Sequence, residues 1–324
     1  MHILITGGAG FIGSHFTRYW VTHHPEDRVT VLDKFTYAGN HHNLADVAHK
    51  ISLVTGDICD EDVVRSTMRD CDTVVHFAAE THVDRSITDP DVFIRTNVLG
   101  THALLRIAKE QGIERFHHVS TDEVLGHLPL HTDERWTEQS PYNPRSPYSA
   151  SKAASDHLVR AYYTTYGLPV SISNCANNYG PYLYPEKLLS LAITNLLENK
   201  KVPVYGTGEQ VREWLQVTDH CRGIEAILQR GTIGETYFIG PSEQRITNKE
   251  LLSKVLTHMG KDESYLEFVP DRLGHDQRYA LSTEKITREL GWQPSISLDT
   301  GLAEMIDWYT NNPTWWKPLK TRAT

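Results

Sequence analysis

The chain has 324 residues, enough for a large α/β domain and a smaller partner that together bury a substantial core. Its formal net charge of −9, from 41 acidic and 32 basic residues, argues against broad electrostatic binding to nucleic acid or to an anionic membrane. The four cysteines are widely spaced, and neither a cleavable leader nor a membrane-length apolar run is evident, so we expect a cytoplasmic protein with reduced thiols.

Eighteen histidines raise the question of a metal site. Adjacent histidines such as His117 and His118 point in different directions on a strand or helix, and the spacing H-E-x-x-H does not occur. We therefore predict no metal.

A short apolar strand is expected at residues 2–6, directly before glycines at positions 7, 10 and 13. The first glycine permits a tight turn, the second lets backbone N–H groups approach a pyrophosphate, and the third lets the next helix pack closely. Any tight turn between a strand and a helix favours glycine, so the motif needs support from its context. The predicted dinucleotide contacts of this turn are Gly7, Gly10, Phe11, Ile12 and Gly13.

Asp33 ends a second apolar strand at residues 29–32, about twenty residues beyond the glycines, where a carboxylate can accept hydrogen bonds from a ribose. This carboxylate favours NAD over NADP because it would repel a 2′-phosphate, although the following Lys34 weakens the inference. Further strands are expected at residues 51–55, 73–79, 115–119 and 170–174, with long helices at 91–111 and 147–166. This alternation predicts an α/β fold with a Rossmann-type doubly wound parallel sheet over residues 1–176.

The pattern changes after about residue 177, where helices at 186–198 and 248–259 are joined by short strands and turns. No long linker separates the halves, so residues 177–324 are expected to form a smaller C-terminal α/β domain that grows out of the first. The chain is expected to cross back to the first domain near residues 211–240.

The stretch VSTDEVLG places Thr121, Asp122 and Glu123 at the end of a buried strand, where α/β sheets carry their chemistry. Tyr148 and Lys152 are four residues apart, so they share one helix face, and a cationic lysine favours ionisation of the tyrosine. Neighbouring carboxylates repel each other, which leaves one protonated as an acid beside an ionised base. The alternative is that the two carboxylates only cap the next turn.

Several long stretches occur in the same order as in a known family: GGAGFIGSH, LDKFTYAGN, GDICD, HFAAETHVDRSI, STDEVLG, SPYSASKAASDHLVRAYYTTYG, NNYGPYLYPEKLL, VREWLQVTDHCRG and DRLGHDQRYAL. The chain resembles the extended short-chain dehydrogenases/reductases and, within them, the dTDP-glucose 4,6-dehydratases. The resemblance implies an NAD-dependent carbon–oxygen lyase, with residues 177–324 binding the nucleotide sugar. Its product would be dTDP-4-keto-6-deoxyglucose, made by oxidation at C4, elimination of water across C5 and C6, and return of the hydride to C6. The apolar surfaces that remain on the long helices at 91–111 and 147–166 are expected to form the interface of a homodimer.

The resemblance also assigns roles to the residues of this chain. Tyr148, assisted by Thr121 and Lys152, would take the proton of the sugar 4-hydroxyl. Glu123 would then remove the C5 proton as a base, and Asp122 would protonate the departing 6-hydroxyl. Further cofactor contacts are implied for Asp33, Lys34, Thr36, Asp57, Ile58, Phe77, Ala78, Ala79, Thr96, Tyr148, Lys152 and Asn178. The implied substrate contacts are Thr81, Thr121, Asn177, Lys187, Leu188, Pro203, Tyr205, Arg212, Asn248, Arg272 and His275.

Several positions depart from the family pattern, and they put the exact sugar or base in question. Leu125 stands in place of a common tyrosine and Thr81 in place of a common serine, and Gln216, Thr218 and Pro241 are also unusual. A dehydratase of another nucleotide-hexose is therefore an alternative. A nucleotide-sugar 4-epimerase shares the glycine motif and the Tyr/Lys pair, but it needs no Asp122 and Glu123. A catalytically silent NAD-binding protein is a further alternative, but such a protein would not need the five residues Thr121, Asp122, Glu123, Tyr148 and Lys152 together.

Overall fold

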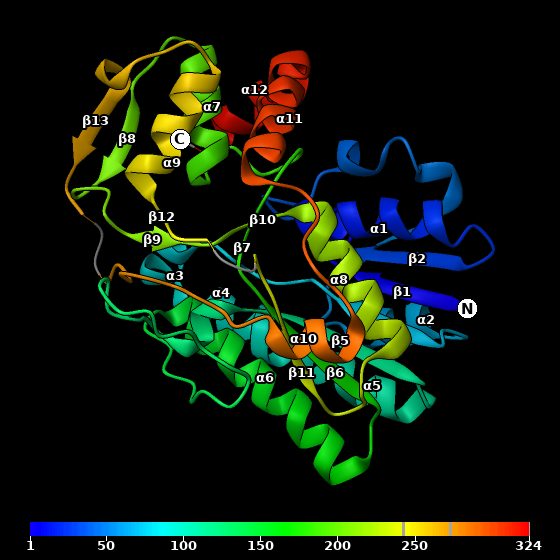
Figure 1. The fold of residues 1–324 in the computed structure, drawn as a ribbon. Helices are drawn as coiled ribbons and strands as arrows, with labels where there is room; N and C mark the ends of the chain where they lie inside the picture. The colour runs from blue at the N-terminus through cyan, green and yellow to red at the C-terminus, as the bar shows by residue number, and fades with distance from the viewer. Residues whose placement is uncertain (242–243, 272–273, 324) are drawn as a thin grey trace.

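A computed structural model describes residues 1–241, 244–271 and 274–323. At its centre is a seven-stranded sheet in the order β11-β6-β5-β4-β1-β2-β3, and every neighbouring pair in it is parallel (Figure 1). The strands are β1 (His2–Thr6), β2 (Arg28–Asp33), β3 (Ser52–Thr55), β4 (Thr73–His76), β5 (Arg115–Thr121), β6 (Val170–Cys175) and β11 (Thr236–Ile239). The predicted doubly wound parallel sheet is confirmed.

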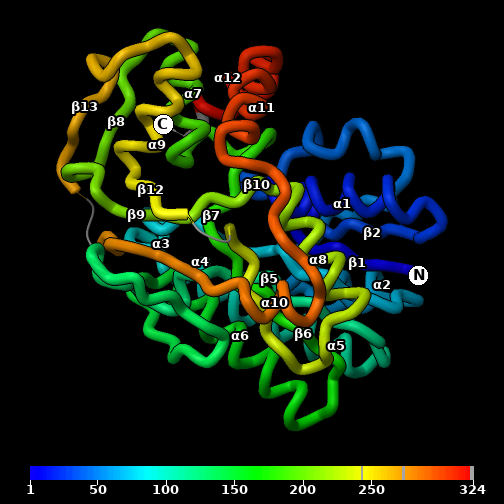
Figure 2. Tube along the Cα trace, in the orientation of Figure 1, coloured from blue at the N-terminus to red at the C-terminus, as the bar shows by residue number. Residues whose placement is uncertain are grey.

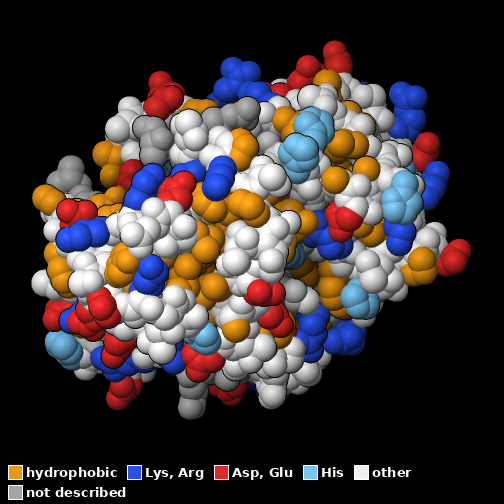
Figure 3. All heavy atoms as spheres, turned by 90° about the horizontal axis from the view of Figure 1, so that it is seen from above, with side chains coloured by type: hydrophobic (Ala, Val, Ile, Leu, Met, Phe, Trp, Pro, Cys, Tyr) orange, Lys and Arg blue, Asp and Glu red, His pale blue; other side chains and the backbone are white. Residues whose placement is uncertain are grey.

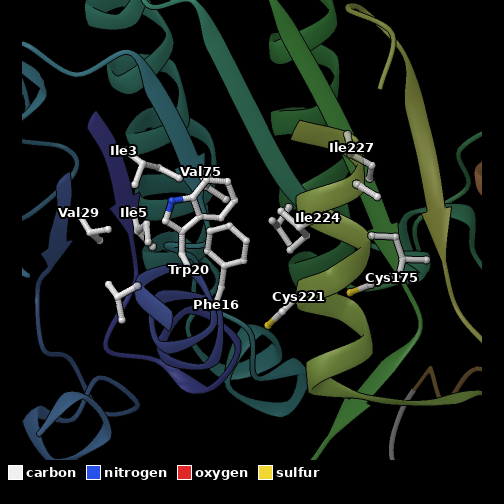
Figure 4. Close-up of a cluster of buried hydrophobic side chains, with 14 of the residues drawn as sticks. Ile3, Ile5, Phe16, Trp20, Val29, Val75, Cys175, Cys221, Ile224 and Ile227 are labelled. Carbon is white, nitrogen blue, oxygen red and sulfur yellow. The ribbon is translucent and has the colours of Figure 1, made fainter. Parts of the chain in front are cut away.

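Helices cover both faces of this sheet because side chains alternate along each buried strand. The face with Ile3 and Ile5 packs on Phe16 and Trp20 of helix α1, and Figure 4 shows the two rings lying against the strands. Helix α8 completes this layer. Leu4, on the opposite face, belongs to the core formed with helices α2, α5 and α6. The helices are α1 (Phe11–His23), α2 (Glu61–Met68), α5 (Thr101–Gln111), α6 (Pro147–Tyr166) and α8 (Val217–Arg230).

Two elements differ from the sequence prediction. The strand expected at residues 73–79 ends at His76, and residues 77–79 leave the sheet to line the cavity described below. The helix expected at 91–111 consists of three consecutive segments, α4 (Pro90–Phe93), a π-helical turn η3 (Ile94–Gly100) and α5. A π turn adds a residue to the helical repeat, a change that a hydrophobic pattern alone does not reveal.

A second lobe packs beside the carboxyl ends of the strands (Figure 1). Its core joins Leu189, Ile193, Leu251, Val255 and Met305, from three different helices. It contains the strand pairs β8 (Val202–Tyr205) with β13 (Leu266–Val269) and β9 (Val211–Arg212) with β12 (Ile246–Thr247), and the helices α7 (Leu188–Leu197), α9 (Asn248–His258), α11 (Leu298–Asn311) and α12 (Pro313–Ala323).

The chain passes repeatedly between the lobes, as the tube in Figure 2 shows. Strand β7 (Asn177–Tyr179) pairs with β10 (Trp214–Gln216), after which α8 and β11 lie in the sheet lobe. The chain then enters the second lobe, crosses back to α10 (Glu284–Leu290), and returns to α11. The remaining short elements are α3 (Val83–Thr88), η1 (His41–Leu44), η2 (Ala48–Lys50), η4 (Asp122–Leu125) and η5 (Glu263–Tyr265).

Acidic and basic side chains are interspersed on the face shown in Figure 3, without a continuous basic surface among the residues drawn. Across the described part of the chain, no helix combines the length and apolarity needed to span a membrane. The same residues bring together no group of three or more His, Cys, Asp or Glu side chains that could hold a metal ion.

Candidate active site

A cavity of about 460 Å³ lies between the carboxyl ends of the sheet strands and the second lobe. Its walls come from the turns after β1, β2, β3 and β4, from β5 and α6, and from α7, β8 and β9 of the second lobe. Every site residue predicted from the sequence lines this cavity, except Arg272, which lies outside the described residues. The structure therefore brings together predicted site residues that are up to 268 positions apart, from Gly7 to His275.

Two glycines of the turn after β1 differ in how closely the surrounding protein packs against them. Gly7 has a φ of +71°, and a Cβ there would lie 2.6 Å from the Ala78 Cα, so only glycine fits. A Cβ at Gly10 would meet no described atom closer than 3.3 Å, the Gly7 carbonyl oxygen. This distance to a backbone oxygen is tight for a side chain, and the bare backbone at position 10 suits the close approach of a phosphate group at the start of α1.

Asp33 ends β2 and is buried, with 8% of its surface exposed. Its two carboxylate oxygens accept backbone N–H groups, one from Ala9 at 2.9 Å and one from Phe35 at 2.8 Å, which fixes the carboxylate plane. Lys34 turns away from it and pairs with Asp57 at 2.8 Å. Lys34 therefore does little to weaken the expected preference for NAD over NADP, because its charge is paired with the Asp57 carboxylate.

Asp122 begins the 3-10 turn η4, directly after β5. The turn is capped by Thr121, whose Oγ1 accepts the Glu123 N–H at 3.3 Å, so neither carboxylate acts as the cap. Asp122 has 3% of its surface exposed, and its Oδ2 has no hydrogen-bond partner within the described residues. Burial, reinforced by the nearby Glu123 carboxylate, raises the pKa of Asp122 well above its ordinary value. A protonated carboxyl at this position is a hydrogen-bond donor and can act as a general acid.

Tyr148 and Lys152 lie in the first turns of α6. A capping box between Ser146 and Ser149, with Pro147 as the first helical residue, starts the helix where the sequence predicts it. Lys152 Nζ donates to the Val119 carbonyl at 2.9 Å, and burial lowers the pKa of this lysine to about 8.

The expectation that Lys152 lowers the pKa of Tyr148 is wrong for the chain by itself. Burial, followed by the Glu123 carboxylate, raises the pKa of Tyr148 well above its ordinary value, and the hydrogen bond with Thr121 opposes this only partly. In so buried a site, the cost of desolvating the ionised tyrosine is larger than the gain from its hydrogen bond with Thr121. In the site as built, burial and the Glu123 carboxylate therefore favour the protonated form of Tyr148, although Lys152 lies one turn along the helix.

Arg212 is the main cation on the second-lobe wall. It has 5% of its surface exposed, and its guanidinium lies over the Tyr279 ring, 4.2 Å from the centroid. Three hydrogen bonds, to the carbonyls of Val211, Gln277 and Asp276, fix its plane. A guanidinium has five N–H donors, so this arrangement leaves capacity for an anionic ligand.

The other second-lobe side chains of the cavity differ in exposure. Tyr205 has 40% of its surface exposed, and the His275 ring contacts Asp271 through Nδ1 at 2.6 Å. The Oδ1 atoms of Asn177 and Asn248 are buried without a hydrogen-bond partner within the described residues. Amide oxygens in this state fit a ligand that brings hydroxyl or N–H donors.

The sequence reasoning missed several cavity residues near the cofactor loops. Two of them, Tyr37 and Glu186, are held by Arg85 of helix α3, which lies over the ring of Tyr37 at 3.8 Å and donates to Glu186 at 3.0 Å. Other cavity residues that were missed are Glu80, His82 and Tyr279. The one available signal was position, since Tyr37 and Glu80 follow closely on the ends of β2 and β4.

Leu125 and Thr81, two of the departures from the family pattern, differ in their placement. Leu125 is buried, 3% exposed, and packs with Val124, Leu128 and Trp136 rather than lining the cavity. Thr81 lines the cavity, and its carbonyl accepts a hydrogen bond from Lys187 at 3.3 Å. Only Thr81 can contact a ligand directly.

Comparison with known proteins places this architecture among sugar-nucleotide enzymes. A family described as GDP-mannose 4,6 dehydratase matches residues 4–305. The dTDP-glucose 4,6-dehydratase of Mycobacterium tuberculosis is 48% identical over 321 residues, 99% of this chain and 96% of that protein. DesIV, the dTDP-glucose 4,6-dehydratase of Streptomyces venezuelae solved with NAD bound, has a TM-score of 0.95 at 50% identity over 98% of this chain and 100% of its own. The UDP-glucose 4-epimerase of Thermotoga maritima has a TM-score of 0.90 at 26% identity, over 97% of this chain and 100% of its own.

Proposed function

Because this chain belongs to the dTDP-glucose 4,6-dehydratase family, we propose that its cavity carries out oxidation, elimination and reduction on one bound sugar. The reaction converts dTDP-glucose to dTDP-4-keto-6-deoxyglucose with NAD+ as the cofactor, which makes the protein a carbon–oxygen lyase. The observation that carries the residue assignment is the pairing of a buried, proton-retaining Asp122 with Glu123 in the cavity that also holds Tyr148 and Lys152.

Bound NAD+ supplies the acceptor for the hydride of C4, the donor that returns it to C6, and a positive charge. The residues that would hold the cofactor fit it, since the bare backbone at Gly10 leaves space for a pyrophosphate and the Asp33 carboxylate can accept ribose hydroxyls. The pairing of Lys34 with Asp57 supports NAD over NADP, because Lys34 is not directed at a 2′-phosphate.

Tyr148 takes the proton of the sugar 4-hydroxyl, with Thr121 and Lys152 as its partners. The hydrogen bond with Thr121 favours the ionised tyrosine, in opposition to burial and to Glu123. Lys152, fixed by the Val119 carbonyl, contributes a positive charge and ammonium donors for the cofactor ribose.

Asp122 and Glu123 divide the elimination between them. A ketone at C4 acidifies the C5 hydrogen, which Glu123 removes as the base. Asp122 keeps its proton because it is buried beside another carboxylate, and it delivers that proton to the departing 6-hydroxyl. Both groups lie on one 3-10 turn, so one backbone segment sets their relative positions.

The second lobe recognises the nucleotide. The N–H groups of Arg212 that are not bonded to the three backbone carbonyls donate to the diphosphate. Asn177 and Asn248 offer amide oxygens to the ligand. On this assignment residues 1–176 form the NAD-binding domain and 177–324 the nucleotide-sugar domain, with α8 and β11 as the returning segment.

We further propose a homodimer in the cytoplasm. The outer surface of η3 and α6 exposes Ile94 (46%), Leu99 (57%), Tyr163 (41%) and Tyr166 (52%), and these two elements pack side by side. A second copy placed against these helices would bury this apolar surface. All four cysteines of the chain are free thiols, which suits a reducing compartment.

The test is turnover without added cofactor. Purified protein incubated with dTDP-glucose should yield a product lighter by one water, identified by mass spectrometry, because the reaction consumes no net oxidant. UDP-, GDP- and CDP-glucose serve as parallel substrates, since the description of the matching family names GDP-mannose. Turnover of another nucleotide-glucose in preference to dTDP-glucose would reassign the substrate, and formation of a C4 epimer would reassign the reaction.

A further inference from the structure

A polar cluster is buried behind Lys152, on the side away from the cavity. His118 of β5 and Asp156 of α6 each have 0% of their surface exposed, and neither lines the cavity. Lys152, by contrast, lines the cavity and has 4% of its surface exposed. An ionised carboxylate this deep in a protein needs hydrogen bonds and a counter-charge.

The contacts run in sequence from the lysine to the carboxylate. Lys152 Nζ lies 3.3 Å from His118 Nε2, and the same ring nitrogen lies 3.2 Å from Asp156 Oδ1. Asp156 Oδ2 accepts hydrogen bonds from Ser120 Oγ at 2.9 Å and from the Tyr142 hydroxyl at 2.8 Å. The Asn174 amide Nδ2 donates to the same oxygen at 3.4 Å, so three donors converge on Oδ2, an arrangement that stabilises the ionised carboxylate.

The charges of the cluster follow from burial and proximity. Burial lowers the pKa of His118 to about 4, so the imidazole is neutral, and its Nε2 either accepts a hydrogen bond from Lys152 or donates one to Asp156, according to its tautomer. The pKa of Asp156 stays below its ordinary value, with His118 as the main opposing influence to burial. Its carboxylate is therefore anionic at neutral pH.

The other groups around Lys152 carry no negative charge at neutral pH. On β6, burial raises the pKa of the Cys175 thiol to about 12, and on β4 the buried His76 has a pKa well below its ordinary value. Tyr148, one turn earlier on α6, has a raised pKa. Asp156 is thus the ionised group that offsets the cost of burying the Lys152 ammonium.

We propose that Asp156, acting through His118, is a positioning residue that keeps Lys152 protonated and directed along the wall of the cavity. The inference rests on the proposed function, in which the Lys152 ammonium is needed for oxidation of the sugar. Asp156 touches neither cofactor nor substrate in this account. Its contribution is electrostatic and should appear as a pH effect.

The test compares the pH dependence of kcat/KM for the wild-type holoenzyme and for Asp156→Asn. An amide of the same shape removes the anion, so Lys152 loses its proton at lower pH. The alkaline limb of the profile should move down by about one pH unit, which corresponds to about a tenfold loss of kcat/KM on that limb. Asp156→Glu, which restores a carboxylate, should recover part of the shift.

The matched control is His117→Gln. His117 neighbours His118 on β5 but points to the other face of the sheet, where its ring bonds Ser171 and Ser173. It is equally buried, so its replacement reports the cost of disturbing a buried polar group on this strand. The alkaline limb should stay in place in this variant even if its thermal stability falls.

Each outcome decides one question. A folded Asp156→Asn with an unmoved alkaline limb overturns the inference and leaves the proposed function intact. A wild-type protein without dehydratase activity overturns the proposed function instead. If Asp156→Asn does not fold, His118→Gln takes its place, with a smaller shift in the same direction expected and an unmoved limb again contradicting the inference.

Discussion

The two walls of the cavity place their ionisable groups in different environments. On the wall built by β5, η4 and α6, burial displaces the pKa values of Asp122, Tyr148 and Lys152, in two cases upward and in one downward. On the second-lobe wall, Arg212 has its plane fixed by backbone carbonyls, and Tyr205 remains 40% exposed. The first wall is arranged for proton transfer, which needs displaced pKa values, and the second for holding charged and polar groups of the ligand.

The largest expected effect comes from the first wall. Glu123→Gln removes the proposed base without changing the size of the side chain. Exchange of the C5 hydrogen with deuterated solvent should slow by about 10²- to 10⁴-fold, as measured by mass spectrometry. Glu138→Gln is the control, since Glu138 is a half-buried carboxylate outside the cavity that accepts the Phe238 N–H. Undiminished exchange in Glu123→Gln would assign the base to another residue.

A smaller effect is expected on the second wall. Arg212→Lys keeps the positive charge but loses the planar donors that match a diphosphate. KM for dTDP-glucose should rise about tenfold with a smaller change in kcat, as steady-state kinetics would show. Arg278→Lys provides a comparison, because Arg278 is also buried nearby but does not line the cavity. A fall in kcat alone would mean that Arg212 acts in the chemical step, and the distinction between the walls would fail.

The smallest effect is expected at the departure from the family pattern that faces the cavity. Thr81→Ser removes one methyl group and keeps the hydroxyl, so KM should change by less than about fourfold, the equivalent of one buried methylene. Steady-state kinetics with dTDP- and UDP-glucose would measure it. A change in the preferred nucleotide would show that position 81 selects the base, against the assignment of recognition to the second lobe.

The sequence predicted most of the site because its key residues sit at the ends of regular elements. Helix α6 begins at Pro147 and ends at Tyr166 as expected, since a cap at one end and Gly167 at the other mark it. The glycine turn and Asp33 were found for the same reason. The catalytic roles proposed for these residues come from the family resemblance.

The sequence could not predict how deeply the ionisable side chains of the site are buried. The raised pKa of Asp122 was expected from repulsion by Glu123, but desolvation is the larger cause. The same effect reversed the expected direction for Tyr148, and it hid the partners of Lys152, because His118 looks like any strand residue until α6 is packed over it. Contacts between segments far apart in the chain, such as Arg85 of α3 with Glu186, depend on the tertiary fold alone.

The central claim is that Asp122 delivers the proton that lets the 6-hydroxyl leave, while Glu123 acts independently at C5. The most direct measurement uses Asp122→Asn with dTDP-glucose in deuterated solvent, following C5 exchange and product formation by mass spectrometry in the same sample. The account predicts that deuterium still enters at C5, while dTDP-4-keto-6-deoxyglucose forms at least about 10²-fold more slowly than with the wild-type protein. Loss of both signals together, or product formation at the wild-type rate, would contradict it.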